Sequence, residues 1–174
     1  MSTEIKLRAQ IFLHSSAVDK IHCFCNIIVP CNGCSFSFKM KNRNTELFKK
    51  FKANGLHTCM DTSLYAPPAA IEALLPYVDM WLPDYKAEDD VLHKKFTKVS
   101  NRIIKKNLER LVEAKAKIEV RCLSVPNCTD GADLAARHRY LNSVGISEAA
   151  IADLTYNDYA RSKYLALGLK DTLP

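Results

Sequence analysis

The chain has 174 residues, of which 48% are hydrophobic and 25% charged, a composition that suits one globular domain with a buried core. No apolar run approaches the roughly 20 residues that cross a bilayer, and the polar start MSTEIKLRAQIFLHSS is unlike a signal peptide, so we expect a cytoplasmic protein without a membrane partner. The formal net charge is +6, and much of the excess lies in 39–52. This basic run could bind nucleic acid, but we favour a solvated helix face because no nucleic-acid-binding fold accompanies it.

Four of the seven cysteines lie close together, in the stretch CFCNIIVPCNGC. They are Cys23, Cys25, Cys31 and Cys34. Four neighbouring thiolates could chelate zinc or an iron–sulfur cluster. The alternative, which we favour, is that they are ordinary reduced cysteines in an apolar segment. A secreted disulfide framework is not expected without a signal peptide.

The pattern of apolar residues predicts strands that alternate with helices. In chain order the expected elements are two short strands within 21–38, a helix over 44–55 that stops at Gly55, a strand at 56–61, a helix at 68–76 entered through Pro67 and Pro68, a strand at 78–84, helical segments at 88–96 and 100–115, a strand at 117–125, a helix over 130–145 that stops at Gly145, a strand at 148–155 whose composition also fits a helix, and a last helix over 158–168. Such alternation predicts an α/β fold with a mostly parallel sheet.

Charged residues fall at or near the ends of three of these strands. They are Asp61, then Asp84 and Lys86, then Arg121. Because the carboxyl ends of parallel strands meet at one edge of a sheet, we expect the four side chains to converge on a ligand site. Structural alternatives exist for each one singly: Asp61 could cap a turn, Asp84 and Lys86 could form a simple ion pair, and Arg121 could be a rim residue.

Four stretches resemble, in order and spacing, the later part of the glycyl-radical enzyme activases, a family of the radical S-adenosylmethionine superfamily that includes pyruvate formate-lyase activating enzyme. They are GLHTCMDTSLYAP, VDMWLPDYKAEDDVLHKKFTKVSN, IEVRCLSVPNCTDG and YNDYARSKYLALGLKDTLP. We therefore expect a divergent, Cys-containing segment at 1–43 and an activase-like βα domain at 44–174, with the N-terminus truncated or divergent. The resemblance implies an incomplete TIM-like barrel of parallel βα units.

The resemblance also implies a function and its site. Family members are oxidoreductases that bind a [4Fe–4S] cluster and S-adenosylmethionine, cleave the latter reductively, and abstract a hydrogen from a glycine of a partner glycyl-radical enzyme. Asp61 matches the acid of the family's DT[NS]G strand end. Asp84 and Lys86 match its D-x-K segment, and Arg121 matches the arginine before VPG. Cations at such positions suit the carboxylate of S-adenosylmethionine, and carboxylates suit its amine and sulfonium. Asn157 replaces the histidine of the family's PYH and is assigned to the same site.

The sequence departs from the family pattern at several points. The C-x3-C-x2-C motif is absent: Cys31 and Cys34 have the spacing of its second half, but Ile27 stands where its first cysteine would be. The glycine-rich GGE segment is missing, and Leu64 and Asn127 stand where the family has glycine. These departures favour weak or absent activity. Two alternatives to an activase therefore remain: a non-catalytic remnant that binds the partner enzyme, and a small Cys-rich protein that binds zinc or nucleic acid.

Overall fold

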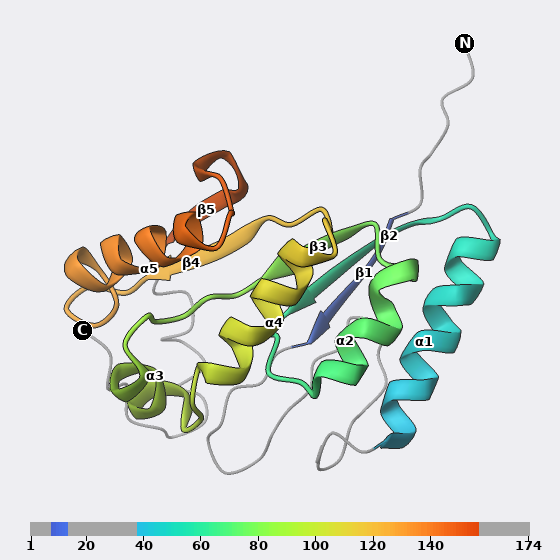
Figure 1. Ribbon diagram of the computed structural model, residues 1–174, viewed down its shortest axis with the longest axis horizontal. Coiled ribbons are helices and arrows are strands. Elements are labelled where there is room, and N and C mark those ends of the chain that lie inside the picture. The colour runs from blue at the N-terminus through green and yellow to red at the C-terminus, as the bar shows by residue number, and fades with distance from the viewer. Residues whose placement is uncertain (1–7, 14–37, 157–174) are drawn as a thin grey trace, which may run out of the picture.

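The computed structural model describes residues 8–13 and 38–156 (Figure 1). In chain order the elements are β1 (Arg8–Leu13), α1 (Phe38–Ala53), β2 (His57–Thr62), α2 (Pro68–Leu74), the 3-10 helix η1 (Leu75–Tyr77), β3 (Met80–Pro83), α3 (Asp90–Thr97), α4 (Arg102–Glu113), β4 (Val120–Ser124), α5 (Gly131–Ser143), the 3-10 helix η2 (Glu148–Ala150) and β5 (Ile151–Thr155). Cys23, Cys25, Cys31, Cys34, Asn157, the strands predicted within 21–38 and the predicted last helix lie outside the described residues.

All described strand pairs are parallel, so the predicted α/β class is confirmed. The order is β1-β2-β3 in one sheet and β4-β5 in a second. Two isolated parallel bridges, Trp81 to Ile118 and Asp84 to Arg121, connect β3 to the β4 side. Pro83 lies between the two bridges and has no N–H to donate to a ladder, which explains why the pairing of β3 with β4 is interrupted.

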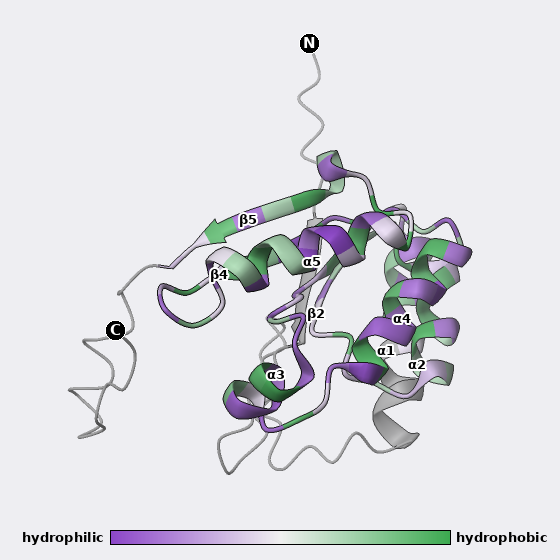
Figure 2. Cartoon of the chain, turned by 60° about the vertical axis from the view of Figure 1, so that its left-hand side comes forward, coloured by the Kyte–Doolittle hydropathy of each residue, from purple (hydrophilic) through white to green (hydrophobic). Residues whose placement is uncertain are grey.

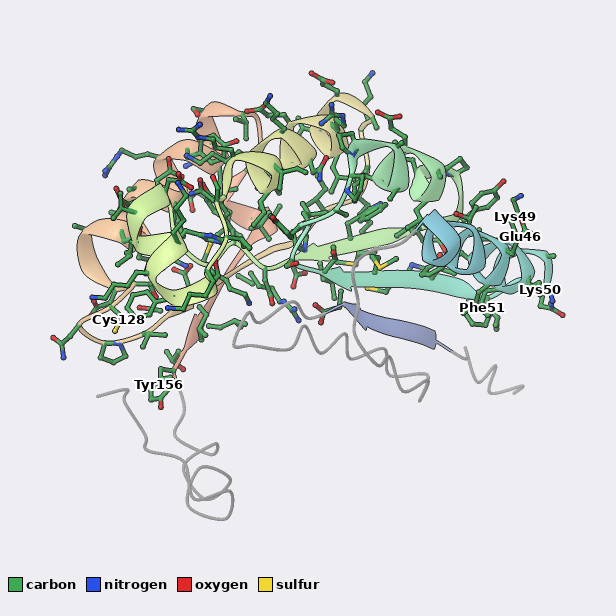
Figure 3. The ribbon with its side chains drawn as sticks, turned by 90° about the horizontal axis from the view of Figure 1, so that it is seen from below. Glu46, Lys49, Lys50, Phe51, Cys128 and Tyr156 are labelled. Atoms are coloured by element: carbon green, nitrogen blue, oxygen red, sulfur yellow. The ribbon has the colours of Figure 1, made fainter. Side chains whose placement is uncertain are left out.

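The described helices pack on one side of the strands, as the view from below shows (Figure 3). In α4 the apolar residues Ile104, Leu108 and Leu111 are buried, and hydrophobic and hydrophilic residues alternate along the helix (Figure 2). The core cluster draws on every layer: it includes Phe48, Met60, Ile71, Trp81, Leu108, Leu111, Val120 and Leu141. In the described part of the chain, no helix has the length and apolar character that a membrane crossing requires.

Most predicted elements are present, with shifted ends. Helix α1 begins at Phe38, six residues before the predicted start, and ends ahead of Gly55, whose φ of 69° gives the left-handed stop. The predicted division between residues 43 and 44 falls within α1 and stays a prediction. Strand β1 was not predicted, whereas β5 forms within the range expected for the last strand.

Candidate functional site

The four charged side chains predicted from the strand ends lie together, near the carboxyl ends of β2 and β3; Arg121, however, is the second residue of β4 rather than its end, and the bridge to Asp84 brings it level with them. The guanidinium of Arg121 on β4 donates to Asp84 Oδ1 from Nε at 2.9 Å and from Nη2 at 2.7 Å. Its Nη2 also donates to Oδ1 of Asp61 on β2. Lys86 Nζ reaches the other oxygen of Asp84 at 3.1 Å. Arg121 thus bridges two strands' carboxylates, and Lys86 extends the network outward.

Asp61 is the most buried member of this network and Lys86 the most exposed. The exposed fraction of the side chain is 1% for Asp61, 18% for Arg121 and 32% for Lys86. Burial lowers the pKa of Arg121, but the nearby carboxylates of Asp84 and Asp61 outweigh that effect and raise it above its ordinary value. The guanidinium therefore stays charged and fixed, and Lys86 is the cation best placed to meet a ligand.

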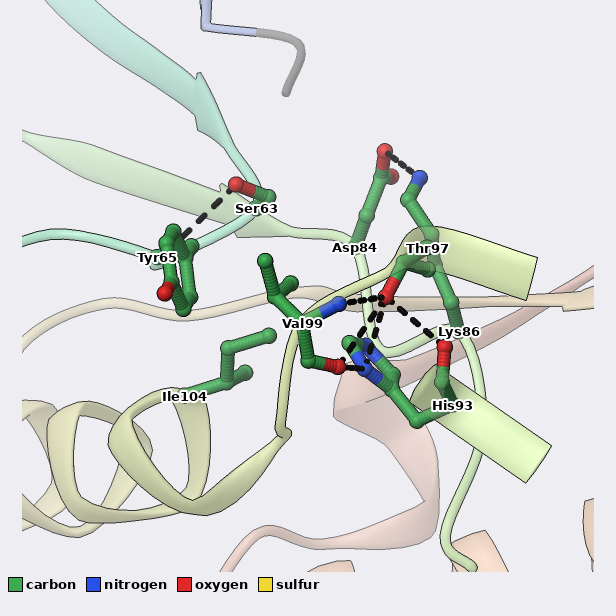
Figure 4. Close-up of a pocket in the computed structure, with 8 residues that line it drawn as sticks. All are labelled: Ser63, Tyr65, Asp84, Lys86, His93, Thr97, Val99 and Ile104. Carbon is green, nitrogen blue, oxygen red and sulfur yellow. Dashed lines mark hydrogen bonds and ion pairs between the residues drawn. The ribbon is translucent and has the colours of Figure 1, made fainter. Parts of the chain in front are cut away.

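A small cavity of about 10 Å³ adjoins Asp84 and Lys86, with room for about one water molecule (Figure 4). Its lining residues are Ser63, Tyr65, Asp84, Lys86, His93, Thr97, Val99 and Ile104. His93 is buried, and this burial lowers its pKa. Its Nδ1 lies 2.7 Å from the carbonyl oxygen of Val99, an arrangement that assigns the proton of the neutral ring to Nδ1.

The sequence analysis did not single out His93 or Thr97. Thr97 Oγ1 donates to the carbonyl of His93 at 2.8 Å and lies 2.9 Å from its Nδ1. The two residues are four apart on α3, so they share one helix face. The available signal was therefore a His and a Thr at helical spacing, in the helix that begins four residues after Lys86.

The loop after β2 is held by a buried amide from α4. Asn107 Nδ2 donates to the carbonyls of Leu64 and Ala66, both at 2.9 Å. Leu64 has a φ of 55°, so this backbone adopts the left-handed conformation for which the family has glycine. Asn107 thereby fixes the loop that directly follows Asp61.

Metal-binding groups are absent from the part of the chain that carries this site. Among the described residues, no group of three or more His, Cys, Asp or Glu side chains could hold a metal ion. Cys122 and Cys128 are free thiols there. The four cysteines predicted as metal ligands lie outside the described ranges, so their role stays a prediction.

Comparison with curated proteins relates this chain to enzymes of one kind. It is 36% identical over 126 residues to the (2S)-3-sulfopropanediol dehydratase activating enzyme of Klebsiella oxytoca, a match that covers 71% of this chain and 40% of that protein. It is 30% identical over 126 residues to the pyruvate formate-lyase 1-activating enzyme of Escherichia coli K12, covering 70% of this chain and 50% of that protein. The homologues of this chain are glycyl-radical enzyme activating enzymes. The predicted family resemblance is confirmed.

These activase homologues are longer than the chain. It spans half or less of the two relatives' lengths. The trans-4-hydroxy-L-proline dehydratase activating enzyme of Clostridioides difficile is 33% identical over 116 residues, which cover 65% of this chain and 38% of that protein. No protein-family model matches the chain.

Two solved structures share the fold. A domain of pyruvate-formate lyase-activating enzyme from Bacteroides vulgatus superimposes with a TM-score of 0.58 at 20% identity, over 78% of this chain and 92% of that one. Streptococcus suis SuiB bound to S-adenosylmethionine superimposes with a TM-score of 0.53 at 13% identity, over 66% of this chain and 26% of that one. At these identities the likeness shows the fold alone.

Proposed function

We propose that this chain is the S-adenosylmethionine-binding part of a glycyl-radical enzyme activase, and that its sheet belongs to an incomplete TIM-like barrel. The observation that carries the proposal is the convergence of Asp61, Asp84, Lys86 and Arg121 at one sheet edge, in a chain whose homologues are activases. In this function the chain, with a [4Fe–4S] cluster, takes part in forming a radical on a glycine of a partner enzyme. The relatives do not favour the zinc- or nucleic-acid-binding alternative, nor the non-catalytic one.

The donor set fits the charges of S-adenosylmethionine, which carries a carboxylate, an amine and a sulfonium. Lys86, the most exposed member, would bind the carboxylate while it stays oriented by Asp84. Asp84 would face the cationic side of the ligand. Asp61 is too deeply buried to make a large contact with the ligand. It would instead hold Arg121 in place. Asn157 would complete this site, a role that remains a proposal.

A [4Fe–4S] cluster, when bound, supplies the electron for reductive cleavage of S-adenosylmethionine. By the family resemblance its ligands would come from the Cys-rich segment, in which Cys31 and Cys34 have the C-x2-C spacing. A site that used all of Cys23, Cys25, Cys31 and Cys34 would leave no open iron for the substrate. The described residues contribute binding and orientation rather than metal ligation.

The binding step can be tested separately from the chemistry, by calorimetric titration of the chain with S-adenosylmethionine. We expect the Lys86→Met variant to bind about tenfold or more weakly, since one charge-assisted hydrogen bond contributes about 1.5–3 kcal/mol. Lys106→Met is the matched control, because Lys106 is an exposed lysine on α4 outside the site. Equal affinities in all three proteins, or no binding by the unmodified chain, would contradict the proposed site.

The chemical step requires anaerobic reconstitution with iron and sulfide. About four irons per chain, together with cleavage to 5′-deoxyadenosine under a strong reductant, is the expected result for an activase. Binding of S-adenosylmethionine without iron uptake or cleavage would instead identify a non-catalytic relative that has kept the binding site.

A further inference from the structure

A single buried side chain joins the carboxyl ends of β3 and β4 from the helix side. Arg137 on α5 is 0% exposed. Its Nη1 donates to the carbonyl of Tyr85 at 3.0 Å and to that of Leu123 at 3.1 Å. Its Nη2 donates to the carbonyl of Thr129. One guanidinium therefore joins the segment after β3, which is 52 residues away in sequence, to β4 and to the loop between β4 and α5.

The charge of Arg137 is matched within the same helix. Asp133, one turn earlier, lies 3.0 Å from Arg137 Nε through its Oδ2. The other oxygen of Asp133 accepts the backbone N–H of Glu88 at 2.9 Å, so the ion pair also holds the segment that leads into α3. A buried guanidinium is costly unless it is paired and hydrogen-bonded, and an apolar residue of similar volume would fill the space. What the arginine adds is directional bonds to backbone carbonyls.

These bonds lie next to the candidate site. Tyr85 stands between Asp84 and Lys86 in sequence, and Leu123 follows Arg121 by two residues on β4. Pro83 interrupts the direct pairing of β3 with β4, so lateral hydrogen bonding between the strands is sparse just before the site. One residue beyond Asp84, the N–H of Tyr85 donates to the carbonyl of Arg121, and Arg137 adds a second lateral connection through the carbonyls of Tyr85 and Leu123.

We propose that Arg137 is a positioning residue: it sets the spacing between the strand end that carries Asp84 and Lys86 and the strand that carries Arg121. The consequence for binding of S-adenosylmethionine rests on the proposed function. The consequence for the spacing of the strands does not, so the two can be tested separately.

Amide hydrogen exchange measured by NMR tests the spacing directly. The N–H of Tyr85 donates to Arg121 at 2.9 Å near the site, while the N–H groups of Trp81 and Glu119 join the same two segments farther from it. In Arg137→Met we expect protection at Tyr85 and Glu88 to fall at least tenfold more than at Trp81 and Glu119. Arg137→Lys keeps the charge but has fewer hydrogen-bond donors. In this variant we expect protection at Tyr85 and Glu88 again to fall more than at Trp81 and Glu119, but by a smaller factor. An even loss of protection across all four amides would overturn the proposal.

If Arg137→Met does not fold, amide protection at the same four residues is compared in Arg137→Lys and Asp133→Asn. An even loss across the four amides would again overturn the proposal. Titration with S-adenosylmethionine gives the second readout. We expect the dissociation constant to rise at least fivefold in Arg137→Lys. It should not change in Leu111→Ala, a core variant destabilised in the last turn of α4, outside the candidate site. Equal affinity in Arg137→Lys and the unmodified chain would overturn the link to binding. Failure of the unmodified chain to bind would reject the proposed function and this link, while the exchange data would still decide the strand spacing.

Discussion

Two positions where the family has glycine keep a left-handed backbone but differ in what their side chains do. Leu64 has a φ of 55° and is fully buried in the core, whereas Asn127 has a φ of 58° and is exposed. A left-handed conformation costs a residue with a Cβ about 1–2 kcal/mol, and asparagine less. Removing a buried leucine side chain costs about 2–5 kcal/mol. The loss of packing therefore outweighs the relief of strain at Leu64.

The prediction at this scale is that Leu64→Gly lowers the free energy of unfolding by about 2 kcal/mol, even though it restores the family's residue. Asn127→Gly should change it by less than about 0.5 kcal/mol, because no buried contact is lost and asparagine already tolerates the conformation. Urea unfolding followed by the fluorescence of Trp81, the chain's single tryptophan, measures both. Stabilisation of the chain by Leu64→Gly would show that the Leu64 side chain adds no packing energy.

The sequence could indicate the backbone conformation at these residues but not their burial. The motif comparison identified Leu64 and Asn127 as sites of unusual turns, and the structure gives both a positive φ. It could not reveal that Leu64 enters the core or that Asn107 holds its carbonyl, because that contact joins residues 43 apart in sequence. The strand-end charges were predictable, since parallel strands place their carboxyl ends at one edge.

Among the elements, those with clear start or stop signals were predicted best. Pro68 begins α2, and Gly145, with a φ of 96°, follows α5. The start of α1 was missed because residues 38–43 are largely basic or polar and show no apolar stripe. Strand β1 was missed because its apolar run IFL is too short to distinguish from loop sequence. Strand β5 was expected from the alternation of elements although its composition also fits a helix.

The attachment of β5 to α5 is the element-scale feature that should respond to pH. His138 on α5 lies 2.9 Å from Glu148 through Nδ1 and 2.9 Å from Asp153 on β5 through Nε2. The hydrogen bond to Asp153 and the one to Glu148 raise the pKa of His138 above its ordinary value, against a lowering effect of burial. A raised pKa in the folded state means that the charged ring stabilises the fold.

We therefore expect the stabilisation from His138 to be fully present below about pH 6.5 and to disappear as the pH rises through the raised pKa. The stability advantage of the chain over His138→Gln should therefore be slightly larger at pH 6 than at pH 8, and this difference should shrink in 0.5 M salt, since both carboxylates are exposed. Burial lowers the pKa of His93, which has the opposite effect on stability, but this contribution is common to both proteins. His138→Gln should remove this part of the pH dependence. Unfolding free energies at the two pH values measure the effect, and an unchanged pH dependence in His138→Gln would contradict it.

At the scale of the whole described fold, one core spans two sheets. Met60 and Trp81 come from the first sheet and Val120 and Cys122 from the second, and all four belong to the same hydrophobic cluster. Helix α4 contributes Leu108 and Leu111 to that cluster. Sequence patterns predicted the parallel strands, but they could not predict that Pro83 divides the sheet or that Arg137 reconnects it. Both features depend on which distant segments meet in space.

A shared core predicts that the two sheets unfold together despite the sparse pairing between them. Trp81 is 1% exposed, so its fluorescence reports loss of packing at β3, whereas far-UV circular dichroism reports helices and strands throughout. We expect the two urea transitions to coincide, because separating the sheets would expose apolar surface that only the common core covers. Leu108→Ala should lower the free energy of unfolding by about 2–5 kcal/mol and shift both midpoints equally to lower urea. If the fluorescence transition preceded the circular dichroism transition, the sheets would be separate folding units, joined at the site by the side chains of Arg121 and Arg137 and by the backbone hydrogen bond from Tyr85 to Arg121.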